Sequence, residues 1–116
     1  MSAAEYRKMP VKKKDPVGLT HIKTVLAGMG LPFDTEYRFH PVRRWRFDIA
    51  IFLPDNICVA VEYDGIMSAK SRHTSCTGFT GDCDKTNAAA VLGWKILRYT
   101  VLNFRNFKTD LETLTS

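Results

Sequence analysis

The stretch from Arg43 to Gly65 constrains the fold of this chain more than any other part of it. It contains two segments rich in aromatic and β-branched residues, Arg44–Leu53 and Ile57–Asp64, a composition typical of β-strands. The tripeptide Pro-Asp-Asn separates them at positions 54–56, and these three residue types favour tight turns. The sequence therefore predicts two strands joined by a short turn.

Both predicted strands carry acidic side chains in an otherwise apolar setting. Because side chains along a strand alternate between its two faces, Asp48 shares a face with Arg44 and Arg46. Glu62 and Asp64 likewise share one face of the second strand. Carboxylates in such a setting are costly unless a cation pairs with them. Mg²⁺ prefers hard oxygen ligands, so the pattern predicts a divalent cation held by Asp48 and Glu62.

Three helices and two further strands are expected around this pair. They are a helix at Pro16–Met29, a strand at Glu36–Pro41, a helix at Asp82–Leu92, a strand at Trp94–Thr100 and a closing helix at Leu102–Leu114. We expect Asp15 to cap the first helix and Gly30 to end it. A strand, a helix and a strand at this spacing form a β-α-β unit, so strands 57–64 and 94–100 should run parallel. The expected order, α-β-β-β-α-β-α, describes one α/β domain with a mixed sheet over residues 16–116.

Two segments lack any regular hydrophobic pattern. Residues 1–15 are polar and basic, and we expect a flexible arm that is either a solvated tail or a contact with phosphate. Residues 66–80 are polar, carry Lys70, Arg72 and His73, and predict a long loop. Loops of this length in compact domains are usually functional or disordered.

Charge and cysteine content limit the class of protein. The chain of 116 residues has 17 Lys and Arg against 12 Asp and Glu, a net charge of +5 that fits a polyanionic partner such as nucleic acid. No apolar run approaches the ~20 residues of a membrane span, so no membrane association is expected. The three cysteines are an odd number, and one falls in a predicted strand, which indicates a reducing, cytoplasmic setting without disulfides.

Two further residues are candidates for the site. The backbone carbonyl of Tyr63, at the end of its strand, could add a ligand to an ion held by Asp48 and Glu62. Lys85 falls early in the helix expected to pack over the sheet, where its ammonium could orient a water or offset developing charge. An ion at such a place activates water for attack on a phosphate.

Several motifs, taken in order, resemble those of the PD-(D/E)xK nuclease superfamily. They are E-Y-R-F-H-P-V-R-R-W-R-F-D at Glu36–Asp48, V-E-Y-D-G at Val61–Gly65, R-H-T at Arg72–Thr74, D-C-D-K at Asp82–Lys85 and G-W-K-I-L-R at Gly93–Arg98. Within the superfamily the chain is most similar to small phage-type Holliday junction resolvases, over residues 34–100.

The resemblance implies a restriction-endonuclease-like α-β-β-β-α-β core, in agreement with the order expected from the pattern. It also implies Mg²⁺ or Mn²⁺ bound by Asp48 and Glu62, and hydrolysis of DNA phosphodiester bonds. A resolvase cuts four-way junctions symmetrically and needs two active sites, so it implies a two-fold homodimer. A phage-encoded enzyme of this kind would act in the host cytoplasm.

The chain departs from the superfamily pattern at one position. Where the superfamily usually has Lys, two residues after the Glu, this sequence has Asp64. We interpret Asp64 as a further carboxylate of the site, with Lys85 supplying the positive charge from the helix. Relatives often add a carboxylate from the first helix, which has no acidic residue here, and Glu36 is the nearest substitute.

Basic side chains beside the expected site are candidates for DNA contacts. Arg43, Arg44 and Arg46 are either a solvated strand end or contacts with phosphate, and their density favours the second interpretation. Lys70, Arg72 and His73 in the 66–80 loop are interpreted in the same way. A zinc site built from His73, Cys76 and Cys83 is an alternative, although its spacing lacks a clear fourth ligand.

Two other functions are compatible with the same residues. One is a monomeric nicking or repair endonuclease, which keeps the chemistry and changes the substrate. The other is a nucleic-acid-binding module that has lost catalysis, which the Asp64 departure supports and the paired Asp48 and Glu62 oppose.

Overall fold

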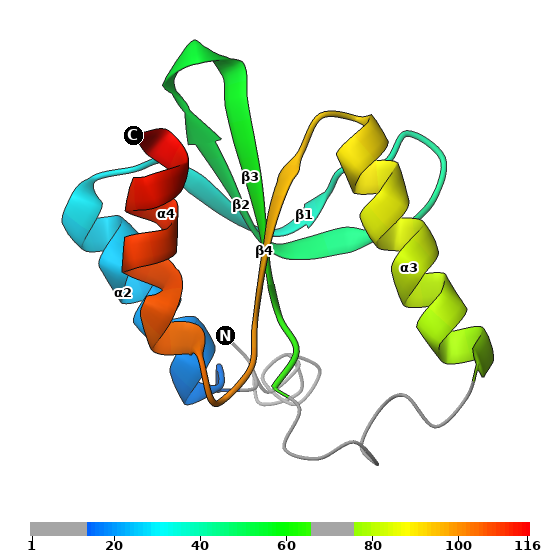
Figure 1. Cartoon of the computed structure of the whole chain (residues 1–116), viewed down its shortest axis with the longest axis horizontal. Coiled ribbons are helices and arrows are strands. Elements are labelled where there is room, and N and C mark those ends of the chain that lie inside the picture. Colours follow the sequence, from blue (N-terminus) through cyan, green and yellow to red (C-terminus); the bar gives the residue numbers. More distant parts are fainter. Residues whose placement is uncertain (1–13, 66–75) are drawn as a thin grey trace, which may run out of the picture.

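A computed structural model of the chain describes residues 14–65 and 76–116 (Figure 1). Its elements, in chain order, are α2 (Val17–Met29), β1 (Phe33–Arg38), β2 (Arg46–Leu53), the 3₁₀ turn η1 (Pro54–Asn56), β3 (Ile57–Tyr63), α3 (Cys76–Val91), β4 (Lys95–Tyr99), the 3₁₀ turn η2 (Phe104–Asn106) and α4 (Phe107–Thr115). Helices α2 and α4 cover one face of a four-stranded sheet, and α3 covers the other (Figure 1). The expected α/β class is thereby confirmed.

The sheet has the strand order β1-β2-β3-β4. β1 pairs with β2, and β2 pairs with β3, in antiparallel orientation, whereas β3 and β4 are parallel with Val61 opposite Leu97. The sheet is therefore mixed, and the expected parallel pair is confirmed. Parallel neighbours require a crossover connection, and α3 provides it between β3 and β4.

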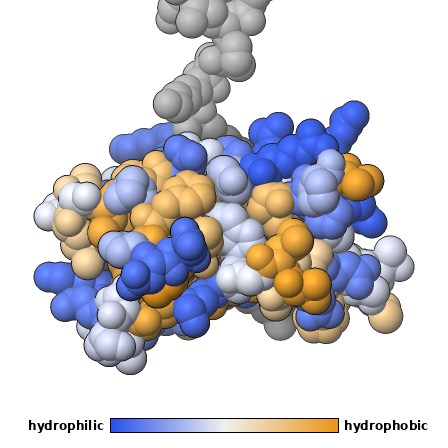
Figure 2. Space-filling view, turned by 90° about the horizontal axis from the view of Figure 1, so that it is seen from above, coloured by the Kyte–Doolittle hydropathy of each residue, from blue (hydrophilic) through white to orange (hydrophobic). Residues whose placement is uncertain are grey.

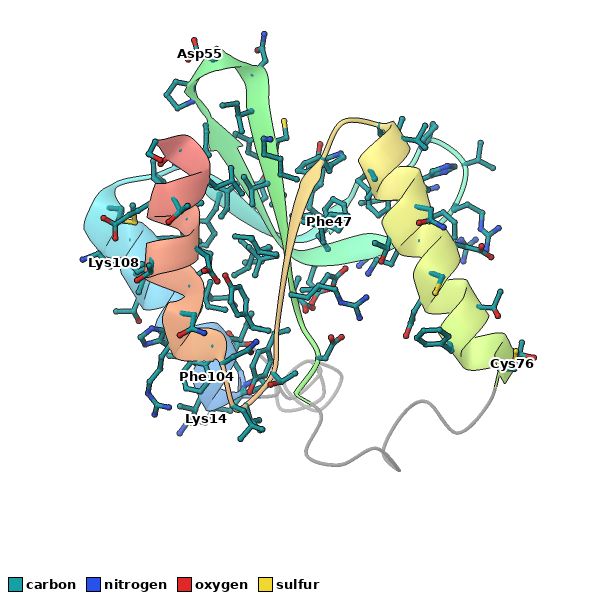
Figure 3. All side chains as sticks on the ribbon, in the orientation of Figure 1. Lys14, Phe47, Asp55, Cys76, Phe104 and Lys108 are labelled. Carbon is teal, nitrogen blue, oxygen red and sulfur yellow. The ribbon has the colours of Figure 1, made fainter. Side chains whose placement is uncertain are left out.

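Two hydrophobic clusters hold the layers together. The cluster between the sheet and the α2/α4 layer contains Ile22, Leu26, Ile49, Val61 and Phe107, all fully buried, among other residues. The cluster under α3 is smaller and more aromatic, because small alanines of the strands and of α3 leave room for large rings. Its buried members are Phe47, Ala50, Ala60 and Ala89, and Tyr37, Phe39, Phe52, Trp94 and Ile96 pack against them. Figure 3 shows Phe47 between β4 and α3.

The turn between β2 and β3 lies where the sequence predicts it. Asp55 and Asn56 have left-handed backbone angles, with φ of 64° and 58°. Asp and Asn tolerate this conformation better than most residues, which explains why they occupy the tip of the hairpin.

The start of the first helix differs from the expectation. Asp15 does not cap it, because Pro16 is the N-cap residue with an extended ψ of 152°, and no side chain caps the helix. The carboxylate of Asp15 instead pairs with Lys23 at 2.5 Å. Gly30 does end the helix, with φ of 68°. Of the expected basic arm, residues 1–13 lie outside the described part of the chain.

The first strand is displaced from its expected position at Glu36–Pro41. It begins three residues earlier, at Phe33, and ends at Arg38. Phe33 packs against the cluster between the sheet and the α2/α4 layer. Because Pro32 and Asp34 flank it, the alternation of apolar residues does not reveal this tertiary contact. The chain turns after the strand because His40 Nδ1 accepts hydrogen bonds from backbone N–H groups two and three residues later.

Helix α3 begins at Cys76, six residues before the expected start at Asp82, so residues 76–80 are helical and not part of a loop. These residues are exposed, and no apolar face marks them in the sequence. Thr80 Oγ1 donates to the carbonyl of Cys76 at 2.7 Å, a local bond that satisfies a polar side chain within the helix. Gly93, with φ of 93°, follows the end of the helix as expected.

The closing helix α4 begins at Phe107, five residues after its expected start at Leu102. Asn103 Oδ1 accepts from the backbone N–H of Thr100 at 2.7 Å, which forms a turn in place of a first helical turn. Leu102 is consequently 89% exposed and not part of the apolar face.

Among the described residues, no helix combines the length and apolar character needed to cross a membrane.

Candidate functional site

Asp48 lies where β2 and β3 separate. The two strands pair up to Ile49 opposite Val61, so the next register position places Asp48 opposite Glu62. There the carboxylate oxygen Oδ2 of Asp48 accepts a hydrogen bond from the backbone N–H of Tyr63 at 2.8 Å. A side-chain oxygen therefore replaces a backbone carbonyl as acceptor for this N–H group, and the Asp48 carboxyl is held at the fork between two strands.

Glu62 brings a second carboxyl group to the same place. It follows Ala60 on the face of β3 that α3 covers, and its side chain is only 17% exposed. Glu62 forms an ion pair with Lys85 of α3 and, when protonated, a hydrogen bond with Asp48. The structure thus brings together three of the residues that the sequence singles out, Asp48, Glu62 and Lys85.

The surroundings of Glu62 alter its acidity. Burial raises the pKa of Glu62 to about 7, although the Lys85 ammonium acts in the opposite direction. The neighbouring Asp48 carboxyl raises the pKa further, because two negative charges this close repel each other. Near neutral pH the Glu62 carboxyl is therefore poised between its neutral and its charged form.

These residues fit a divalent cation of the Mg²⁺ or Mn²⁺ type. Glu62 Oε1 is buried and, within the described ranges, accepts no well-oriented hydrogen bond beyond its ion pair with Lys85. A cation between Asp48 and Glu62 would satisfy that oxygen and remove the repulsion. Among residues 14–65 and 76–116, no three His, Cys, Asp or Glu side chains converge into a metal-binding group. Mg²⁺ commonly binds one or two carboxylates and keeps several waters, so two are sufficient.

Asp64 is held by a residue of the neighbouring strand. Arg98 on β4 donates to both oxygens of Asp64, at 3.0 Å to Oδ1 and 3.1 Å to Oδ2. Glu62, Asp64, Lys85 and Arg98 line one small cavity of about 20 Å³, together with Asp82 and Thr86. That volume holds about one water molecule.

Arg98 is the main site residue that the sequence does not single out, although it belongs to the last of the quoted motifs. The signal lies in the register, because β3 and β4 are parallel and place Arg98 directly beside Glu62. The register between strands 57–64 and 94–100, which the pattern of each strand does not give, was therefore needed to identify Arg98.

Glu36 does not join the carboxylate pair. It lies between Thr35 and Tyr37, which pair with Ile49 and Phe47, so its register position is opposite Asp48. Its side chain is exposed and its φ is 49°, a left-handed angle that disfavours residues other than Gly, Asn and Asp.

Tyr63 contributes its backbone N–H to the site and its side chain to the opposite layer. Its ring packs so closely on α2 that a Cβ at Gly18 would lie 2.4 Å from Tyr63 Cε2. The expected ligand role of the Tyr63 carbonyl stays a prediction.

The expected DNA contacts fall into two groups. Arg43, Arg44 and Arg46 are exposed at the start of β2 and in the connection before it. Lys70, Arg72 and His73 lie outside the described residues. The alternative zinc site depends on His73, so it lies partly outside them as well. Seen from above (Figure 2), hydrophilic residues gather toward the upper right, on the side of the molecule where α3 lies in Figure 1.

The paired carboxyls at a strand fork, a helix lysine and a neighbouring Asp–Arg pair define a compact acidic site on the α3 side of the sheet. Comparison of the chain with models of known protein families, with curated proteins and with solved structures finds no significant match.

Proposed function

We propose that this protein is a metal-dependent DNA endonuclease that resolves four-way junctions. The observation that carries the proposal is the contact of the buried Glu62 carboxyl with both Asp48 and Lys85. Two carboxyls that share charge beside one ammonium suit a site for a divalent cation and a phosphate. A structural role alone would be served better by an apolar residue at position 62, because burying a charge there lowers stability.

The order of elements supports a restriction-endonuclease-like fold. The described chain runs α-β-β-β-α-β-α, and the carboxyl ligands lie on the second and third strands. The resemblance of the motifs between residues 34 and 100 to small junction resolvases implies this arrangement.

In the proposed mechanism, Asp48 and Glu62 would hold the cation, which when bound would supply an activated water and neutralise charge on the phosphate. The hydrogen bond from the Tyr63 N–H keeps the Asp48 carboxyl in its orientation. Lys85 lowers the pKa of Glu62, which favours the ionised carboxyl that a cation requires, and would offset negative charge that develops on the phosphate. Arg98 neutralises Asp64, so that this carboxylate adds little repulsion to an approaching phosphate.

Symmetrical cutting of a four-way junction requires two copies of this site. We therefore propose a two-fold homodimer as the active form, in which each protomer cuts one strand.

The test is cleavage of a synthetic four-way junction, labelled in turn on each strand, with Mg²⁺ and with EDTA. We expect paired, symmetrical nicks that require Mg²⁺, and no comparable cutting of linear duplex or single strands. Asp48→Asn and Glu62→Gln should each abolish cleavage, because each removes a charged ligand. Asp55→Asn is the matched control, since it removes one carboxylate at the distant hairpin tip, where Asn tolerates the left-handed angle.

One observation favours a second candidate, a DNA-binding module without catalysis. The superfamily's usual lysine is absent, and Asp64 at its position is paired with Arg98. If this candidate is correct, the wild-type protein binds junctions without cutting them in Mg²⁺ or Mn²⁺, and Asp48→Asn binds at least as tightly. Nicks in plain duplex would instead indicate a monomeric nicking enzyme.

A further inference from the structure

The connection between β1 and β2, residues 39–45, is stabilised by hydrogen bonds of two side chains, His40 and Arg38. His40 Nδ1 accepts two backbone hydrogen bonds, from Val42 at 3.1 Å and from Arg43 at 2.9 Å. Arg38, at the end of β1, donates to the carbonyls of Val42 and Arg43, each at 3.4 Å. These four hydrogen bonds order the loop before any ligand binds, which lowers the conformational cost of binding.

A column of stacked side chains fastens this β1–β2 loop to the protein core. The Arg43 guanidinium lies 4.3 Å from the Trp45 ring centre, and Trp45 stacks on Phe39 with the ring planes 13° apart. Phe39 in turn stacks on the buried Phe47, at 4.0 Å between ring centres.

The column reaches the candidate site. The Nζ atom of Lys85 lies 5.9 Å from the centre of the Phe47 ring, within the range of a cation–π contact. The same ammonium pairs with Glu62. A contiguous series of packed groups therefore sets the position of the loop relative to the carboxyl pair.

The loop and the adjoining start of β2 present positive charge to solvent. Arg43, Arg44 and Arg46 are exposed, and no acidic side chain within the described residues pairs with them. The guanidinium group binds phosphate oxygens in a bidentate manner. Trp45 already contacts Arg43, Phe39 and His40. It stiffens the loop and is not an open platform for a base, so the surface fits a sugar–phosphate backbone better than unpaired bases.

We infer that the β1–β2 loop is a preformed clamp for the phosphate backbone of a DNA arm, and that His40 is the positioning residue that holds it. The inference rests on the proposed function for the identity of the partner. Three arginines would each contact backbone phosphate, and the aromatic column would hold those phosphates at a constant separation from Asp48 and Glu62.

The first test measures filter binding of the wild-type chain to a four-way junction and to linear duplex, in EDTA, over a series of salt concentrations. Arg43→Ala should weaken binding and reduce the slope of log K against log salt by roughly 0.9, the value for one lost phosphate contact. Arg105→Ala is the matched control. Arg105 is also an exposed arginine over a ring, 4.6 Å from the centre of Phe104, but it lies in η2 on the other layer. It should leave both affinity and slope unchanged.

The second test separates positioning by His40 from a general role in folding. His40→Ala should weaken binding by about tenfold through the loss of two hydrogen bonds, with a melting temperature close to that of the wild type. His40→Asn should restore most of the affinity, because its side-chain oxygen can accept the same two N–H groups. In cleavage assays His40→Ala should raise KM with little change in kcat.

The inference is overturned if the wild type does not bind DNA, if Arg43→Ala keeps the wild-type slope, or if His40→Asn binds as weakly as His40→Ala. Binding that follows the expected pattern without any cleavage would leave the clamp standing and would refute the endonuclease. Cleavage of junctions by an Arg43→Ala protein of unchanged affinity would refute the clamp and support the endonuclease.

Discussion

Glu62 combines two properties that oppose each other in a folded protein: a side chain that is only 17% exposed and an acidic group. Its pKa of about 7, against 4.5 for the free group, records the unfavourable burial of its negative charge. Lys85 relieves only part of this, since desolvation outweighs the attraction. A buried ionisable group that lowers the stability of the fold in this way is commonly part of a functional site.

The pH dependence of stability follows from this pKa. Between pH 4.5 and 7 the unfolded chain loses the Glu62 proton while the folded chain keeps it. The contribution of Glu62 to stability is thus fully present below about pH 4.5 and is lost as the pH rises through 7.

Glu62→Gln should remove this dependence. In EDTA at pH 8, we expect the variant to be more stable than the wild type by on the order of 2 kcal/mol, with a much smaller difference at pH 5. Urea unfolding followed by circular dichroism measures both values. Glu112→Gln, at an exposed position of α4, is the control and should change neither. Equal stability of the two variants at pH 8 would contradict a costly charge at position 62.

Glu36 can be tested through its backbone angle. Its φ of 49° is unfavourable for a residue with a Cβ, and Gly removes the penalty, so Glu36→Gly should stabilise the protein by about 1 kcal/mol or less. Because its side chain is exposed and forms no three-carboxyl group with Asp48 and Glu62, cleavage should continue at the wild-type rate. Asp55→Gly at the hairpin tip, where φ is 64°, is the control, because it relieves a similar backbone angle without changing the candidate site. A loss of cleavage by tenfold or more would restore Glu36 to the catalytic residues.

At the scale of elements, hydrophobic pattern and turn chemistry predict the centre of each strand and helix but not its ends. The turn at 54–56 and the stop at Gly30 were predicted correctly because they depend on local backbone angles. The start of α3 at Cys76 was missed because its first turns face solvent and carry no apolar stripe. The start of β1 at Phe33 was missed because a long-range contact decides it.

The join between β4 and α4 includes one buried hydroxyl in addition to the packing of apolar rings. Tyr99 is 2% exposed, and its OH donates to Asp110 at 2.8 Å, an arrangement that also raises the pKa of the tyrosine. Tyr99→Phe leaves Asp110 without this donor and should lower the free energy of unfolding by about 1–2 kcal/mol.

Tyr37→Phe is the matched control for this change. Tyr37 packs in the cluster under α3, and within the described part of the chain its hydroxyl forms no hydrogen bond. Urea unfolding of the two variants should therefore separate them. If they are equally stable, the Tyr99 hydroxyl contributes nothing to the join.

At the scale of the whole molecule, the sequence predicts which carboxyl groups approach each other but not what surrounds them. Alternation along two strands, together with the turn at 54–56 that sets their register, places Asp48 and Glu62 near one another. The fork at Ile49 and Val61, the Tyr63 N–H bond and the Arg98 pair depend on how four strands and a helix pack, which no local pattern contains.

Binding of Mg²⁺ should stabilise the folded protein as a whole. A ligand that binds only the folded state adds about 2.7 kcal/mol when its concentration is 100 times its Kd. We expect Mg²⁺ to raise the melting temperature of the wild type at pH 8 and to leave that of Asp48→Asn unchanged. Asp55→Asn should respond as the wild type does. A shift of the same size in Asp48→Asn would place the ion elsewhere.

The aromatic cluster under α3 also determines what optical signal the molecule gives. The chain has two tryptophans, and both Trp45 and Trp94 lie on the α3 side of the sheet, Trp94 within 4.9 Å of the Phe47 ring centre. Intrinsic fluorescence therefore reports on the half of the protein that holds the carboxyl pair and the arginines. The α2/α4 half contributes no tryptophan emission, so quenching on addition of DNA or metal could be read as a local event without any attached dye.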